Sequence, residues 1–118
     1  MNDSILNTIK RMLGLTDEQT DFDTDIIIHI NTVLNTLHQI GVFNSEDECF
    51  SIDGPSQKWS DFLTDISKFN MVKSFIYLKV RLLFDPPLNA TVISCMEKQI
   101  AELEFRLLEN HNDYKKKD

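Results

Sequence analysis

Two adjacent prolines late in the chain set the strongest limit on how it can fold. Asp85-Pro86-Pro87 follows one long apolar segment and precedes another. A helix rarely continues through the residue before a proline, because the proline ring clashes with the preceding backbone. The sequence therefore predicts that one helix ends at Asp85 and that Pro86-Pro87 form a rigid elbow. Asn89 is suited to cap the start of the next helix.

Apolar residues on both sides of the elbow recur at helical spacing. This pattern predicts a long antiparallel helical hairpin, with helices over roughly 67–85 and 90–109. Two further helices are predicted before it, over 4–13 and 23–40, each followed by a glycine that suits a helix end. Three glycines and three prolines are too few for the many turns of an all-β domain. The predicted fold class is all-α, a small helical bundle of about four main helices.

The 118 residues fit one domain, which we expect to span 1–118. Residues 42–58 differ in character and are predicted to form an irregular loop. This loop contains a candidate short strand near 49–52, which would need a partner to be stable. Residues 110–118 are polar, and we expect them to form a flexible C-terminal tail.

Lys79 falls within the apolar stripe of the 67–85 helix, where an unpaired lysine is rarely buried. One explanation is that the long side chain extends past the apolar residues to solvent. The other is an ion pair with the next helix. With the elbow near residue 87, the antiparallel neighbour of Lys79 lies near 94–97, where Glu97 stands. A Lys79–Glu97 ion pair at the edge of the core is the resulting hypothesis.

Some residues of the hairpin and tail are candidate contacts with other protein chains. Three aromatic residues and an arginine lie off the predicted core stripes, and these residue types are enriched in protein interfaces. The tail adds a run of lysines, which is interpreted either as a solvated end or as a segment that docks on a partner. The candidate contacts are Tyr77, Arg81, Phe84, Phe105, Lys115, Lys116 and Lys117.

The net charge of −7 argues against a protein that grips nucleic acid, since phosphate binding needs clustered Lys and Arg. Five of the acids lie within residues 16–25. A calcium-binding EF-hand loop also requires a central glycine and a distant glutamate, and this stretch has no glycine. We interpret the acids as solvating the connector and complementing the positive N-terminus of the next helix.

Motifs of catalysis are missing from the sequence: it has no GxSxG, no glycine-rich phosphate loop and no HExxH, and its three histidines are scattered. We therefore expect no enzyme activity, no catalytic, cofactor-binding or metal-binding residues, and no cofactor. Cys49 and Cys95 are isolated. The first residues lack a signal-peptide pattern, and no apolar run approaches the ~20 residues of a membrane span. These features predict a cytosolic protein with reduced thiols and no membrane association.

The elbow segment resembles one found in head-tail connector proteins of tailed bacteriophages, also called head-completion or adaptor proteins. It reads Tyr77-Leu78-Lys79-Val80-Arg81-Leu82-Leu83-Phe84-Asp85-Pro86-Pro87. Three further stretches look like the same family, and with the elbow they extend the resemblance over about residues 4–108. They are Phe22 to Asn31, Trp59 to Leu63, and Met96 to Leu107.

The resemblance implies a structural virion protein with no catalytic residues to carry over. Such proteins form a ring, often of about a dozen copies, under the portal at the capsid vertex. The implied partners are other copies of the chain, the portal protein and a downstream head-tail or tail-completion protein. DNA would pass through the ring without specific binding. The implied location is the capsid-tail neck of the virion, with host cytoplasm during assembly.

Two other kinds of protein share features with this chain. A small helical regulatory or adaptor protein, acting through protein-protein contacts, would have the same acidity and outward-facing aromatic residues. A helical DNA-binding protein is the second alternative, and the negative charge argues against it.

Overall fold

The computed structural model describes residues 2–41, 50–63 and 66–116, with side chains up to residue 109. These residues form four α-helices and one short 3-10 helix, η1, and no strand. An isolated antiparallel bridge joins Ser4 to Lys58. The predicted all-α fold is therefore confirmed. The elements are α1 (Ile5–Met12), α2 (Asp23–Gln39), η1 (Trp59–Asp61), α3 (Ile66–Phe84) and α4 (Ala90–Lys116).

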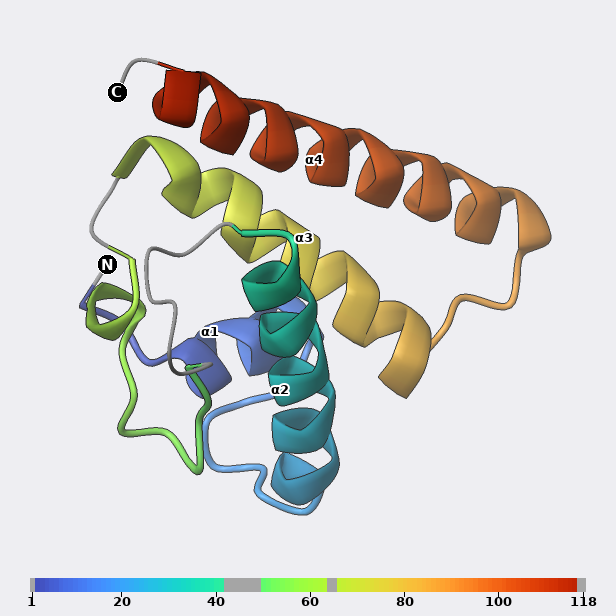
Figure 1. Cartoon of the computed structure of the whole chain (residues 1–118). Coiled ribbons are helices and arrows are strands. Elements are labelled where there is room, and N and C mark those ends of the chain that lie inside the picture. The colour runs from blue at the N-terminus through green and yellow to red at the C-terminus, as the bar shows by residue number, and fades with distance from the viewer. Residues whose placement is uncertain (1, 42–49, 64–65, 117–118) are drawn as a thin grey trace.

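Helix α3 is the centre of the arrangement. It packs against α2 and α1 on one side and against α4 on the other, so α4 forms an outer layer (Figure 1). Contacts from two directions bury Val72, Phe75, Ile76 and Val80 completely. The apolar spacing of the 67–85 helix also predicts that Leu83 lies on the core stripe, but Leu83 is 53% exposed, because α3 and α4 diverge toward the elbow (Figure 1).

The elbow forms as predicted. Helix α3 ends at Phe84, and the backbone N–H of Asp85 makes the last helical bond, to the Arg81 carbonyl oxygen at 2.9 Å. The Arg81 side chain returns to cap this end, with Nε donating to the Asp85 carbonyl oxygen at 2.7 Å. After the prolines, the Asn89 side chain accepts a hydrogen bond from the Thr91 N–H at 2.8 Å. Asn89 is therefore the N-cap of α4.

Helix α4 packs on α3 through a narrow seam. Met96, Ile100 and Leu107 are buried, and Ile93 before them and Leu103 among them are half-buried. The steps of three and four residues are those of a coiled-coil seam, which leaves most of the helix surface free.

The last helix is longer than the sequence predicted. It continues to Lys116 instead of ending at 109. Residues 110–116 are polar, yet they contain no glycine or proline that would stop a helix. Flexibility of the tail stays a prediction, since residues 117–118 lie outside the described residues.

The candidate strand near 49–52 is not formed over 50–52, and residue 49 lies outside the described part of the chain. The backbone of Ile52 pairs with a side chain instead of a strand. Asn31 Oδ1 accepts from the Ile52 N–H at 2.8 Å, and Asn31 Nδ2 donates to the Ile52 carbonyl oxygen at 2.9 Å. An amide side chain has the donor and acceptor of a peptide unit, so it replaces the missing strand.

Trp59 anchors η1 to the start of the chain. Its ring is fully buried, and its Nε1 donates to Thr8 Oγ1 at 3.1 Å. Two backbone bonds flank it, from the Trp59 N–H to the Asp3 carbonyl oxygen and from the Ile5 N–H to the Gln57 carbonyl oxygen. These contacts hold η1, which precedes α3, against the start of α1.

A buried lysine, which the sequence analysis did not identify, joins α1 to the acidic connector and α2. Lys10 is fully buried, and its Nζ lies 2.9 Å from Asp23 Oδ1 and donates to the Asp17 carbonyl oxygen at 3.1 Å. Asp23 Oδ1 is buried and has no hydrogen-bond partner among the described residues, so the contact with Lys10 is an ion pair. Asp23 belongs to the first turn of α2, where a carboxylate also stabilises the helix N-terminus.

Replacing this lysine should strongly destabilise the fold. Lys10→Met keeps the apolar stem but leaves the partly buried Asp23 carboxylate, 22% exposed, without its partner, which costs about 1–3 kcal/mol. We expect a lower urea midpoint in equilibrium unfolding followed by circular dichroism. Lys98→Met, an exposed lysine on α4, is the matched control and should change the midpoint little. Equal effects of the two substitutions would contradict the assigned role of Lys10.

Candidate interaction surface

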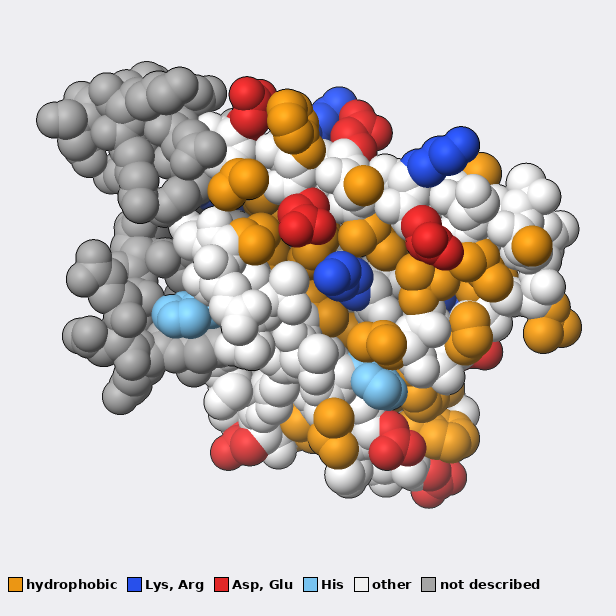
Figure 2. Space-filling model, turned by 45° about the vertical axis from the view of Figure 1, so that its right-hand side comes forward, with side chains coloured by type: hydrophobic (Ala, Val, Ile, Leu, Met, Phe, Trp, Pro, Cys, Tyr) orange, Lys and Arg blue, Asp and Glu red, His pale blue; other side chains and the backbone are white. Residues whose placement is uncertain are grey.

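A shallow pocket of about 500 Å³ lies where the end of α3 meets the start of α2. The connector before α2, the first two turns of α2 and the last residues of α3 each contribute to its lining. Figure 2 shows hydrophobic side chains gathered on this side of the molecule, with acidic side chains among them and along its lower edge. We call it the elbow pocket; it is lined by Leu15, Phe22, Asp25, His29, Leu83, Phe84 and Asp85.

The walls of the elbow pocket are apolar and partly open to solvent. The rings of Phe22 and Phe84 meet edge to face, with centroids 5.5 Å apart. Phe22 is 45% exposed, and Leu83 beside it is more than half exposed. Leu88, just after the prolines, is fully exposed. Large apolar side chains left uncovered together are typical of a surface that binds another protein.

Acidic side chains surround these walls. Asp25 and Asp85 line the pocket and are exposed, and Asp21 precedes Phe22 in the chain. None of the three forms a salt bridge with another residue that the structure describes. The guanidinium of Arg81 binds the Asp85 carbonyl oxygen and lies 3.4 Å from the Tyr77 hydroxyl oxygen. The pocket therefore combines an apolar floor with two exposed carboxylates, Asp25 and Asp85, that form no salt bridge among the described residues, while the Arg81 cation lies against the Asp85 backbone.

Within the connector of residues 16–25, Asp17 forms an ion pair with Arg11 at the surface. Arg11 Nη2 lies 2.7 Å from Asp17 Oδ2, and Arg11 Nε donates to Asp17 Oδ1 at 3.1 Å. This two-pronged hydrogen bond lowers the pKa of the Asp17 carboxyl below its ordinary value, and the nearby positive charge of Arg11 adds to the effect. The same contact raises the pKa of Arg11.

The candidate contact residues of the hairpin separate into two groups. Tyr77, Arg81 and Phe84 are half-buried, and the two aromatic rings pack against the core. Phe84 also lines the elbow pocket, so it is the member of this group that belongs to an open surface. Arg81 caps the end of α3, which makes its main contacts internal.

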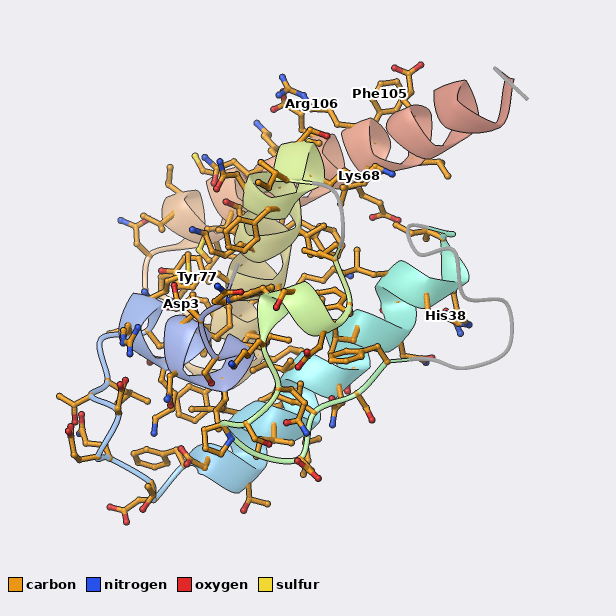
Figure 3. All side chains as sticks on the ribbon, turned by 90° about the vertical axis from the view of Figure 1, so that its left-hand side faces the viewer. Asp3, His38, Lys68, Tyr77, Phe105 and Arg106 are labelled. Carbon is orange, nitrogen blue, oxygen red and sulfur yellow. The ribbon has the colours of Figure 1, made fainter. Side chains whose placement is uncertain are left out.

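Phe105 belongs to the second group. It is 61% exposed, and it projects outward from α4 beside Arg106 (Figure 3). Fifteen residues separate it from Ala90, or about 22 Å along the helix, so it lies far from the elbow. The side chains of Lys115 and Lys116 are not described, and Lys117 lies outside the described residues.

The hypothesis of a Lys79–Glu97 ion pair is not supported by the structure. Lys79 Nζ lies 5.2 Å from the ring centroid of Phe75, one turn earlier in its own helix, and no salt bridge within the described ranges joins it to Glu97. Lys73 makes the same kind of contact with Phe69, at 5.0 Å. A cation over an aromatic ring is attracted by the π electrons, so the ring serves in place of the carboxylate.

Sequence reasoning missed three features of this part of the molecule. The spacing of Phe and Lys four residues apart on α3 would have indicated the cation–π contacts. Lys10 lies one turn after Leu6 on the apolar face of α1, which was a sign of its burial. No local sequence pattern could indicate the pairing of Asn31 with Ile52, because the two residues are 21 positions apart in the chain.

Among the residues that the structure describes, no three His, Cys, Asp or Glu side chains gather as ligands of a metal ion. No helix in the described ranges is both long and apolar enough to cross a membrane.

Comparison with known proteins relates nearly the whole chain to one family. A family model described as phage connector protein matches residues 5–115. Neither a curated protein nor a solved structure gave a match to the chain.

The Arg11–Asp17 contact between α1 and the connector should make stability depend on pH. Because the pKa of Asp17 is lower in the folded chain than in the unfolded one, its carboxylate stabilises the fold above the ordinary value of 3.8. That contribution is lost as the pH falls below this value and through the folded pKa. Asp17→Asn should therefore reduce the urea midpoint at about pH 7 and have little effect near about pH 2.

Arg11→Gln provides the control for this experiment. In that background Asp17→Asn should have a much smaller effect at neutral pH, because the partner is already gone. An effect of Asp17→Asn that is the same at both pH values would contradict the assignment.

Proposed function

Since the chain belongs to the phage connector protein family, we propose that it is a structural protein of the virion neck that joins the portal vertex of the capsid to the tail. The match to the family model over residues 5–115 carries this proposal. In the proposed role, about a dozen copies form a ring that extends the DNA channel. The ring binds the portal protein on one face and the next neck or tail-completion protein on the other.

The distribution of exposed apolar side chains supports a role in assembly. A ring is built from heterologous contacts, in which one surface of each copy meets a different surface of the next. The elbow pocket with Leu83 and Leu88 is one apolar surface. The outer face of α4, with Phe105 and Leu108 exposed, is a second one at some distance. Two separate apolar surfaces on one small domain suit a repeated contact of this kind.

The negative charge supports a channel that DNA passes without being held. The net charge is −7, and the acids of the connector are mostly exposed. Like charges repel, so acids near the lumen keep phosphates moving, whereas clustered lysines would trap them. The proposed work of the protein is binding other proteins, with no catalysis and no cofactor.

The C-terminal lysines are proposed to act at assembly. Helix α4 ends at Lys116, and Lys117 follows it in the sequence. A run of three cations of this kind suits docking on an acidic partner surface, such as one on the portal or a neighbouring copy.

Deletion of the gene tests the proposed function. Without the protein, capsids should fill with DNA but fail to join tails, and wild-type virions should contain the protein at the neck by immunogold labelling. Normal tailed virions that lack the protein would contradict the proposal and favour a regulatory adaptor. The position of the gene discriminates as well, because a connector gene is expected between capsid and tail genes. DNA binding that weakens steeply with salt would favour a DNA-binding protein.

The free protein should be a monomer or a small oligomer. A connector that closed into rings before heads were filled would remove itself from assembly, so the portal is expected to trigger ring formation. Multi-angle light scattering of the pure chain should give a mass near the 13.7 kDa of one copy or a few times that value. Rings should form on addition of portal protein. Stable rings of the chain alone would contradict this prediction.

A further inference from the structure

We propose that the elbow pocket of one copy receives the C-terminal segment 114–117 of a second copy. This contact rests on the proposed function and specifies how neighbouring copies in the ring would join. Its two sides are the apolar, acidic pocket at one end of the hairpin and the basic end of α4.

The chemistry of the pocket selects a cationic segment with an aromatic or aliphatic residue next to the charges. Phe22, Leu83 and Phe84 provide apolar contacts, and Asp25 and Asp85 place carboxylates at the rim. The volume of about 500 Å³ accommodates one large side chain. Since neither carboxylate has an ion-pair partner in the described part of the chain, an incoming ammonium group would gain attraction without breaking an existing pair.

The chain itself contains one segment with these properties. Tyr114 is followed by Lys115, Lys116 and Lys117, the only run of three cations in the sequence. Tyrosine offers a flat apolar ring with a polar tip, which suits a pocket edged by Phe22 and Phe84. The lysines would then lie at the level of the acidic rim.

The geometry requires the two partners to be different copies. Helix α4 begins beside the elbow at Ala90 and leads away from it, so that the C-terminus lies at the opposite end of the hairpin (Figure 1). Lys116 is 26 residues from Ala90, which is about 39 Å along the helix axis. A contact between a tail and a pocket of another copy is heterologous, and its repetition produces a ring or an open chain.

A contact of this size is expected to be weak by itself. Asp25 and Asp85 are exposed, so salt screens their attraction for the lysines. Once a portal holds the copies side by side, the effective concentration of each tail near the next pocket rises, and the same weak contact becomes favourable. This explains how a monomeric chain would assemble only on its platform.

A peptide of residues 110–118 provides the direct test. Its binding to the ¹⁵N-labelled full chain should shift the amide signals of Phe22, Asp25, Leu83 and Asp85 in NMR titrations. The apparent Kd should rise at least tenfold for Asp25→Asn/Asp85→Asn, and it should rise with salt. Leu83→Ser, at an exposed position, should also weaken binding.

Two controls separate pocket binding from general attraction to an acidic protein. Glu97→Gln/Glu109→Gln removes the same number of charges from exposed positions on α4 and should leave the affinity unchanged. A peptide with Lys115, Lys116 and Lys117 replaced by glutamine should not bind. Shifts outside the pocket, or equal losses in both charge variants, would overturn the proposal.

Ring assembly on the portal provides the second test with the full chain. Replacing the three lysines by glutamate should abolish rings, and adding Asp25→Lys/Asp85→Lys in the same chain should restore them. Rings that form normally without residues 115–118 would overturn the tail contact, and the elbow pocket would then receive another protein. Neck location of the protein in virions is unaffected by that result, so the proposed function would stand.

Discussion

The position of α3 between two layers is the constraint on which the rest of the molecule depends. Because α1 and α2 cover one side and α4 the other, α3 has no wholly free face along its middle turns. At its last turn α3 diverges from α4 toward the elbow (Figure 1), and there Leu83 and Phe84 line a pocket together with Phe22, the residue before α2. The elbow pocket is thus a consequence of how the two helices of the hairpin separate just before the prolines.

Two ion pairs shape the electrostatics around that pocket. The buried Lys10 fixes the first turn of α2 through Asp23, and Arg11 holds the connector through Asp17. Lys10 and Arg11, the two cations of α1, are therefore both engaged in ion pairs. Asp25 and Asp85, in contrast, have no ion-pair partner among the described residues. The pairs that stabilise the fold therefore also leave the open surface acidic, which is the property that a cationic partner would recognise.

Much of the fold was predictable from the sequence, and the errors have physical causes. The elbow, the N-cap at Asn89 and the four helices depend on local preferences, which sequence carries directly. Leu83 lies on the apolar stripe of α3, yet packing leaves it exposed. Of the two explanations offered for Lys79, the ion pair with Glu97 is absent among the described residues, because the register of a hairpin does not fix where a long side chain points. The strand near 49–52 was predicted from the chain alone, whereas Ile52 finds its partner in Asn31, far away in sequence.

By itself, the sequence determined the helical class, the position of the rigid turn and the resemblance to connector proteins, because prolines, apolar periodicity and family motifs are properties of neighbouring residues. Tertiary structure alone decided which side chains remain uncovered. Lys10 is buried, Leu83 is exposed and the elbow pocket forms from two distant segments because of the way the helices pack against one another. Packing joins residues that are far apart in the chain, so no local pattern could specify the surface that the protein presents to its partners.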